Sequence, residues 1–207
     1  MEGFVDGPAG RLQALLALPA GASVRGICVV SHPHPLYGGA MTNKVVWTLA
    51  SAAAKAGLAA LRYNFRGVGC SEGLYDNAIG ETEDALAAVA WLQARYPAVP
   101  LVLAGFSFGA YVSIKAANRL APKALVTIAP PFGRYIDNSA PPPRPACPWL
   151  AVHSVDDDTV AYDETVAVLE AYTPPVEFRR FETAGHFFHG QLGELQAAVQ
   201  PFLEQHF

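Results

Sequence analysis

The chain has 207 residues, of which 52% are hydrophobic and 15% are charged, and its formal charge at pH 7 is -4. This composition excludes a disordered protein and predicts a single globular domain over residues 1–207, with a large apolar core. The 14 basic residues are scattered along the chain, so we expect no nucleic-acid partner.

The predicted elements alternate between strands and helices in chain order. Residues 1–20 alternate weakly in polarity, which is typical of an antiparallel edge strand or hairpin. Short apolar runs then predict strands at 26–31, 58–63, 101–105, 124–128, 149–153 and 176–181. Helical periodicity predicts helices at 42–56 with Thr42 as the cap, 81–97, 110–120, 159–171, and from 192 to an interruption at Pro201. The alternation predicts an α/β fold with a mostly parallel sheet, helices on both faces, and ligands bound beyond the carboxyl ends of the strands.

Segments rich in proline and glycine separate these elements. Residues 32–39 and 64–73 form two such turns, and 130–148 contains seven of the chain's 17 prolines. Proline lacks a backbone N–H and cannot continue regular structure, so we expect 130–148 to be an irregular surface segment.

The cysteines and the N-terminal segment indicate the cellular location of the protein. Cys28, Cys70 and Cys147 lie far apart and predict neither a disulfide framework nor a zinc cluster. The first residues lack the basic and apolar regions of a signal peptide, and no apolar run approaches the roughly 20 residues that span a bilayer. We therefore expect a cytoplasmic protein with no membrane partner.

The pentapeptide Gly105-Phe106-Ser107-Phe108-Gly109 is the strongest functional motif. It lies between a predicted strand and a predicted helix, and a G-x-S-x-G turn in that setting lifts a serine hydroxyl above the edge of the sheet. Ser107 is therefore the candidate nucleophile. A nucleophilic serine also needs a base, a group that orients the base, and donors for the oxyanion.

The base and the acid are expected on two later loops at the same edge. His186 follows the strand that ends near Phe181, and the run 156–158 of three aspartates follows the strand that ends at His153. Asp158 is the one expected to cap the next helix. The order serine, acid, histidine matches one particular hydrolase architecture.

A metal site is the alternative reading of the same histidines. His186 and His189 would share a face if their segment were helical, as an H-x-x-H metal motif. This reading needs a third ligand, and the nearest histidines, His32 and His34, belong to a proline-locked loop. We expect no metal, and a metal-dependent hydrolase built on His186, His189 and the aspartates remains the rival reading.

The chain resembles the α/β-hydrolase superfamily, and within it the small bacterial hydrolases that lack a cap. Three motifs carry this resemblance over nearly the whole chain: H-P-H-P-x-x-G-G at 32–39, N-F-R-G-V-G-x-S-x-G at 64–73, and G-F-S-F-G at 105–109. The resemblance implies Ser107 as nucleophile, His186 as base and Asp157 as acid. The family pattern places a glycine three residues before the acid, where this chain has Ser154, so Asp156 stays open as a second choice.

The oxyanion hole of this fold uses the backbone N–H after the nucleophile and one from the loop after the first long parallel strand. The first would be Phe108, and the best-fitting donor of the second loop is Leu36, with Tyr37 as alternative, because Pro33 and Pro35 carry no N–H. Aromatic residues that can line the pocket are Tyr37, Phe106 and Phe187.

These residues predict a serine hydrolase of the carboxylesterase type that acts on a small acyl ester and needs no cofactor. Thioesterase and peptidase reactions use the same machinery and remain alternatives. A non-catalytic binding protein on a hydrolase fold is a further alternative, since folds do not fix functions.

Overall fold

A central sheet of eight strands organises the computed structural model, which describes residues 2–21, 23–133 and 141–207. The strand order is β1-β2-β4-β3-β5-β6-β7-β8. The strands are β1 (Glu2–Gly7), β2 (Gly10–Ala17), β3 (Gly26–Ser31), β4 (Leu58–Tyr63), β5 (Leu101–Phe106), β6 (Ala124–Ile128), β7 (Trp149–Ser154) and β8 (Glu177–Phe181). The helices are α1 (Lys44–Lys55), α2 (Gly80–Arg95), α3 (Phe108–Leu120), α4 (Tyr162–Ala171) and α5 (Leu192–His206), with a short 3₁₀ turn, η1 (Pro35–Tyr37).

The pairing of the strands confirms the predicted hairpin and the mostly parallel sheet. β1 and β2 pair antiparallel to each other, and β2 pairs antiparallel to β4. The remaining neighbours in the sheet, β4–β3, β3–β5, β5–β6, β6–β7 and β7–β8, are parallel. The side chains of β3 to β7 are buried throughout, because helices cover both faces of these strands. This is why their sequences are continuous apolar runs rather than alternating ones.

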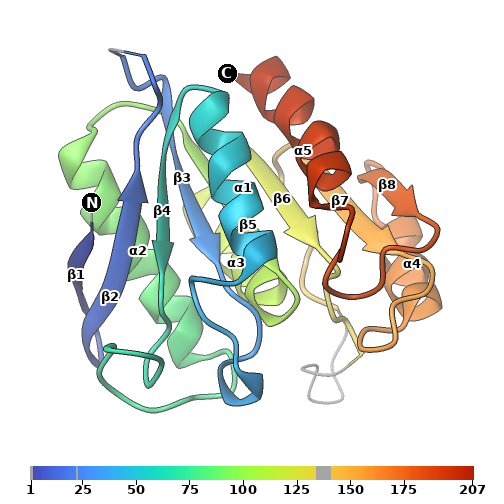
Figure 1. Ribbon diagram of the computed structural model, residues 1–207, viewed down its shortest axis with the longest axis horizontal. Helices are drawn as coiled ribbons and strands as arrows, with labels where there is room; N and C mark the ends of the chain where they lie inside the picture. Colours follow the sequence, from blue (N-terminus) through green and yellow to red (C-terminus); the bar gives the residue numbers. More distant parts are fainter. Residues whose placement is uncertain (1, 22, 134–140) are drawn as a thin grey trace.

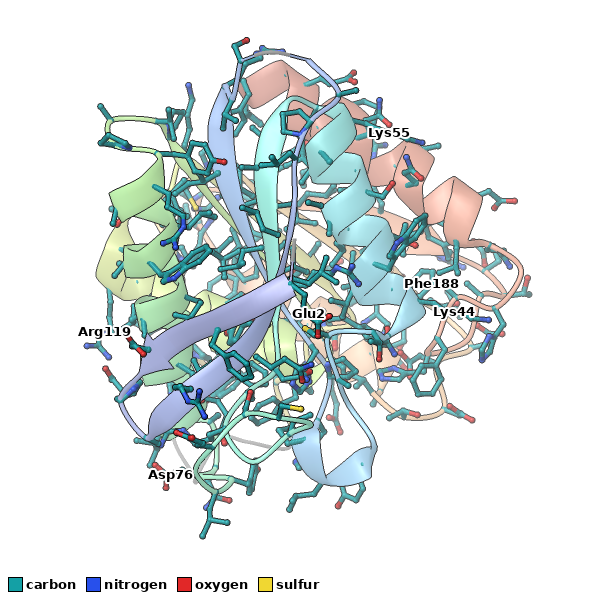
Figure 2. All side chains as sticks on the ribbon, turned by 60° about the vertical axis from the view of Figure 1, so that its left-hand side comes forward. Glu2, Lys44, Lys55, Asp76, Arg119 and Phe188 are labelled. Atoms are coloured by element: carbon teal, nitrogen blue, oxygen red, sulfur yellow. The ribbon has the colours of Figure 1, made fainter. Side chains whose placement is uncertain are left out.

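Two apolar layers, one on each face of the sheet, hold the helices in place. α1 and α5 pack beside each other on one face and α2 and α3 on the other, as Figure 1 shows. In Figure 2, Lys44 and Lys55 mark the two ends of α1, and Asp76 lies on the loop that follows β4. None of the helices among the described residues is long and apolar enough to cross a membrane.

Three predicted helix boundaries are wrong, each for a local reason. The cap of α1 is Asn43 rather than Thr42, because the Asn43 side chain accepts hydrogen bonds from the amides of the first turn. α4 begins at Tyr162 rather than Thr159, and its N-cap is Ala161 rather than the predicted Asp158, because Asp157 binds the amides of Thr159 and Val160 in a turn before the helix. α5 continues through Pro201, where buried Val199, Phe202 and Leu203 pack both halves onto the sheet.

The proline-rich segment carries no helix or strand at residues 130–133 and 141–148, as expected. The remainder of that prediction, residues 134–140, lies outside the described residues.

Candidate active site

Ser107 occupies a strained turn between β5 and α3. Its backbone has φ 55° and ψ -122°, a conformation that residues other than glycine rarely adopt and that is typical of functional sites. The turn is held from both sides, because the Ser107 amide donates to the Ile128 carbonyl at 2.8 Å and the Ser107 carbonyl accepts from the Ala110 amide at 2.8 Å. The strand, the turn and the helix form the strand-to-helix elbow that a G-x-S-x-G nucleophile requires.

The two glycines of the motif make this turn sterically possible. A Cβ on Gly105 would lie 2.2 Å from the Gly109 carbonyl oxygen, and a Cβ on Gly109 would lie 2.3 Å from the carbonyl oxygen of Ser31. Side chains at either position would therefore push β3, β5 and α3 apart.

His186 and Asp157 are in direct contact at the same edge of the sheet. His186 lies in the turn after β8, and its Nδ1 is 2.8 Å from Oδ2 of Asp157, with both side chains almost completely buried. The other oxygen of Asp157, Oδ1, accepts from the amides of Thr159 at 2.9 Å and Val160 at 2.8 Å. The carboxylate thus orients the imidazole while its own orientation is fixed by backbone.

The charge of Asp157 is set by two opposing effects. Burial raises the pKa of a carboxyl group, but the hydrogen bonds from His153 and His186 and the positive field of His186 lower the pKa of Asp157 to well below its ordinary value. Asp157 is therefore a carboxylate at neutral pH.

Asp156, the alternative acid, makes different contacts. Its Oδ1 accepts from the Gly185 amide at 2.8 Å and from the Ser154 hydroxyl at 2.6 Å, and the Ser154 hydroxyl in turn accepts from the Ala184 amide at 2.9 Å. The hydrogen bond from Ser154 and the one from Gly185 lower the pKa of Asp156. Asp156 and Ser154 hold the backbone just before His186, whereas Asp157 contacts the imidazole itself.

Ser107 and His186 line one cavity of about 90 Å³. No hydrogen bond joins their side chains in the described part of the chain, and in structures without substrate such contacts are often longer than in the reacting complex. The other lining residues come from the loop after β3, the start of α1 and the loops after β6, β7 and β8: Pro33, His34, Tyr37, Gly38, Gly39, Asn43, Pro131, Thr159, Val160 and Phe187.

Both backbone amides that were predicted as the second oxyanion donor, those of Leu36 and Tyr37, are already hydrogen-bonded within the loop at residues 32–39. The Leu36 amide donates to Nδ1 of His34 at 3.2 Å, and the Tyr37 amide donates to the His34 carbonyl at 3.1 Å. Leu36 is 66% exposed. The role of Leu36 stays a prediction, and it requires that this amide leave His34. Phe108, the other predicted donor, is the first residue of α3.

His32 joins this loop to the one after β4. Its Nδ1 lies 2.6 Å from the Pro33 carbonyl oxygen, which can only accept, so Nδ1 carries the hydrogen. Its Nε2 accepts from the Phe65 amide at 3.0 Å. Complete burial lowers the pKa of His32 to about 3, so the ring is neutral and serves as a structural link.

Two of the three predicted pocket aromatics line the cavity. Tyr37 and Phe187 are both exposed and form part of its wall. Phe106 does not, because its side chain is completely buried and its ring packs against His186 at 4.9 Å between centroids. The prediction of Phe106 as a wall residue is therefore wrong, and Phe106 packs behind the His186 ring instead.

The H-x-x-H arrangement is not formed. Residues 185–190 are a turn rather than a helix, with His186 buried and His189 exposed. Among the described residues, no three histidine, cysteine, aspartate or glutamate side chains gather in a way that could hold a metal ion.

Arg66 forms a buried ion pair with Asp84. Its Nε and Nη2 donate to the two oxygens of Asp84 at 3.0 and 2.8 Å, and its backbone amide donates to Asp84 as well. This pair ties the loop after β4 to α2.

Sequence reasoning missed two residues of the site, His153 and Ser154. Nε2 of His153 lies 3.2 Å from Oδ2 of Asp157, and Ser154 anchors the His186 turn. Both residues end β7, and their position directly before the acid was the only indication available in the sequence.

The strand order, the elbow and the His186–Asp157 pair define an α/β-hydrolase fold in which the described residues form no cap domain. A family model described as X-Pro dipeptidyl-peptidase (S15 family) matches residues 6–137. The match covers more than half of the chain, so the chain belongs to this family, which is part of the α/β-hydrolase superfamily.

Solved structures of high similarity are serine hydrolase homologues. An α/β serine hydrolase homologue from Coxiella burnetii has a TM-score of 0.92 and 40% identity, over 98% of this chain and 97% of that one. An α/β serine hydrolase without a lid, from Xanthomonas campestris, has a TM-score of 0.90 and 37% identity, over 99% and 94%. An uncharacterized protein of Rickettsia prowazekii is 32% identical over 97% of this chain and 87% of its own length.

Proposed function

We propose that this protein is a serine hydrolase of the carboxylesterase type that cleaves small acyl esters. The observation that carries the proposal is that Ser107, in its strained elbow, and His186, which is hydrogen-bonded to the buried Asp157, line one cavity. The same three residue types, with these contacts, perform acyl transfer on several unrelated folds.

The reaction follows from the roles that the geometry allows. Oγ of Ser107 attacks the ester carbon while Nε2 of His186 takes the hydroxyl proton, and the resulting imidazolium is stabilised by the Asp157 carboxylate. His186 then gives that proton to the departing alcohol, which leaves an acyl group on Ser107. Water, deprotonated by His186, attacks this acyl-enzyme. The bond between Oγ of Ser107 and the acyl carbon then breaks, His186 returns the proton to Oγ, and the acid is released.

The developing oxyanion needs donors next to Ser107. The Phe108 amide follows the nucleophile and belongs to the N-terminus of α3, where the helix dipole favours negative charge. The loop at residues 32–39 supplies the second donor in this proposal, with Leu36 as its predicted source.

The size of the cavity favours a short acyl group. The cavity is small, at about 90 Å³, compared with the roughly 300–1,000 Å³ of pockets that hold drug-sized ligands. An acetyl or propionyl group fits this space, whereas a long acyl chain would extend over the exposed rings of Tyr37 and Phe187.

Peptidase activity is the second candidate, because the matching family model describes dipeptidyl-peptidases. A peptide bound by its free N-terminus presents an ammonium group, which a carboxylate in the cavity would recognise. None of the described residues that line the cavity is an aspartate or glutamate. The proposal therefore places esters first and keeps peptides and thioesters as alternatives.

A cytoplasmic location is part of the proposal. It is supported by the three cysteines, Cys28, Cys70 and Cys147, all of which have free thiols.

Steady-state hydrolysis tests the function directly. We expect purified protein to hydrolyse p-nitrophenyl acetate faster than p-nitrophenyl decanoate, an acetyl thioester or alanyl-proline p-nitroanilide, with no effect of a chelator. Ser107→Ala should lower kcat by about 10⁴-fold or more, because it removes the nucleophile. Ser51→Ala, at a half-buried serine of α1, is the matched control and should leave kcat unchanged. Faster cleavage of the dipeptide anilide would make peptidase the function, and esterase activity that survives in Ser107→Ala would overturn the proposed nucleophile.

A further inference from the structure

A second histidine contacts the carboxylate that orients the base. His153, in β7, is completely buried, and its Nε2 lies 3.2 Å from Oδ2 of Asp157 and 3.1 Å from the carbonyl oxygen of Val160. His186 uses the same Oδ2, through Nδ1 at 2.8 Å. Two imidazole rings therefore converge on one oxygen of the acid.

The partners of His153 determine which of its nitrogens carries the hydrogen. A carboxylate oxygen and a carbonyl oxygen can only accept, so Nε2 must be the donor. Nδ1 is buried without a hydrogen-bond partner in the described part of the chain. Nε2 of His153 therefore carries a hydrogen, which is shared between Oδ2 of Asp157 and the Val160 carbonyl oxygen.

The contacts of His153 close a ring of hydrogen bonds with the acid. Val160 donates its amide to Oδ1 of Asp157 and accepts from His153 at its carbonyl, while His153 also donates to Oδ2 of Asp157. The ring of Tyr162 packs edge-on against His153 at 5.7 Å between centroids and limits its rotation. Since Val160 also lines the cavity, His153 links the acid to the wall of the site.

We propose that His153 is a positioning residue for the reaction, one that holds the Asp157 carboxylate in the plane from which it orients His186. The inference rests on the proposed function, because it assigns Asp157 the role of triad acid. The amides of Thr159 and Val160 fix Oδ1 alone, so without His153 the other oxygen is held only by the imidazole that it has to orient. With His153 in place, the orientation of the acid does not depend on the position of His186 alone.

Two amide variants test this role, His153→Gln and His153→Asn. A glutamine amide nitrogen reaches about as far as imidazole Nε2, whereas an asparagine amide nitrogen ends near the position of Nδ1. We expect His153→Asn to lower kcat for p-nitrophenyl acetate about tenfold, the lower end of the loss seen when an orienting partner is removed. KM should stay within about twofold, because His153 does not contact the substrate. His153→Gln should recover most of the lost kcat.

The outcomes separate this inference from the proposed function. If the wild-type protein hydrolyses the ester but His153→Asn has the same kcat as wild type, the inference is overturned and the proposed function stands. Equal losses of kcat in His153→Asn and His153→Gln would have the same consequence. A wild-type protein that hydrolyses no ester would overturn the proposed function and this role with it.

A spectroscopic measurement keeps the inference testable if either variant fails to fold. Ring-nitrogen NMR of ¹⁵N-histidine-labelled wild-type protein should show a hydrogen on Nε2 of His153, whose signals are assigned through contacts with neighbouring residues of β7. A His153 ring with its hydrogen on Nδ1 would overturn the inference, because that tautomer cannot donate to Asp157.

Discussion

Asp157 is the residue on which most interactions of the site converge. Each of its oxygens accepts two hydrogen bonds: Oδ2 from His153 and His186, and Oδ1 from two backbone amides. A carboxylate that accepts so many hydrogen bonds is stable as an anion even when buried, which the lowered pKa of Asp157 expresses. The proposed acid is therefore charged and fixed before substrate arrives.

His32 has the opposite role, as a buried residue that must stay neutral. Burial lowers its pKa from the ordinary 6.5 to about 3. Between these two values the unfolded chain binds more protons than the folded one, so stability present above pH 6.5 is lost as the pH falls toward 3. The loss contributed by this residue is up to about 1.4 kcal/mol per pH unit.

His32→Gln should therefore flatten the pH dependence of stability. We expect the variant to be less stable than wild type at pH 7.5, since it loses a fitted ring, and to lose less free energy of unfolding between pH 6.5 and 4.5. Urea unfolding at a series of pH values measures this, with His189→Gln as the control at an exposed histidine. If the free energy of unfolding depends on pH in the same way for wild type and His32→Gln, the lowered pKa of His32 is contradicted.

At the scale of elements, the site depends on how closely β3, β5 and α3 approach one another. Ser31 of β3 pairs with Gly105 of β5, and the first turn of α3 packs directly onto the end of β3. Ser107 reaches its positive φ only because its glycine neighbours leave room for this approach. The elbow is thus a packing arrangement of three elements and not a property of five residues alone.

Gly109→Ala tests that packing. The added methyl group would lie 2.3 Å from the Ser31 carbonyl oxygen, and overpacking of this kind costs about 1–3 kcal/mol of unfolding free energy. The matched control is Gly193→Ala in α5, where no atom lies within 4 Å of the new Cβ and the expected change is within about 0.5 kcal/mol. Equal stability of the two variants in urea unfolding would show that the elbow tolerates a side chain at Gly109.

At the scale of the whole molecule, the parallel sheet brings distant loops to one edge. The loops after β3, β5, β7 and β8 carry His34, Ser107, Asp157 and His186, and all four open at the carboxyl ends of their strands. This is the position where open α/β sheets bind ligands.

The sequence predicts the strands, the mostly parallel sheet and the helices on both faces, because buried strands are continuous apolar runs and turn residues separate them. It does not give the order of the strands, which depends on tertiary packing. It places Ser107 and His186, the proposed nucleophile and base, on loops that the structure brings to the same edge. The residues alone did not separate Asp157 from Asp156, since the two are adjacent and only side-chain orientation distinguishes them; the preference for Asp157 came from the family resemblance. Sequence reasoning also missed His153 and Ser154, because their roles depend on hydrogen bonds to loops that fold back from about 4 to 30 residues away.

Covalent labelling of Ser107 is the most direct test of the central claim, that this serine is an activated nucleophile. Purified wild-type protein is treated with a fluorophosphonate and examined by intact mass and peptide mapping, beside Ser107→Ala and a sample with chelator. The account predicts a single adduct on the peptide that contains Ser107, absent from the variant and unaffected by the chelator. No adduct on folded wild-type protein, or an adduct on another residue, would contradict it.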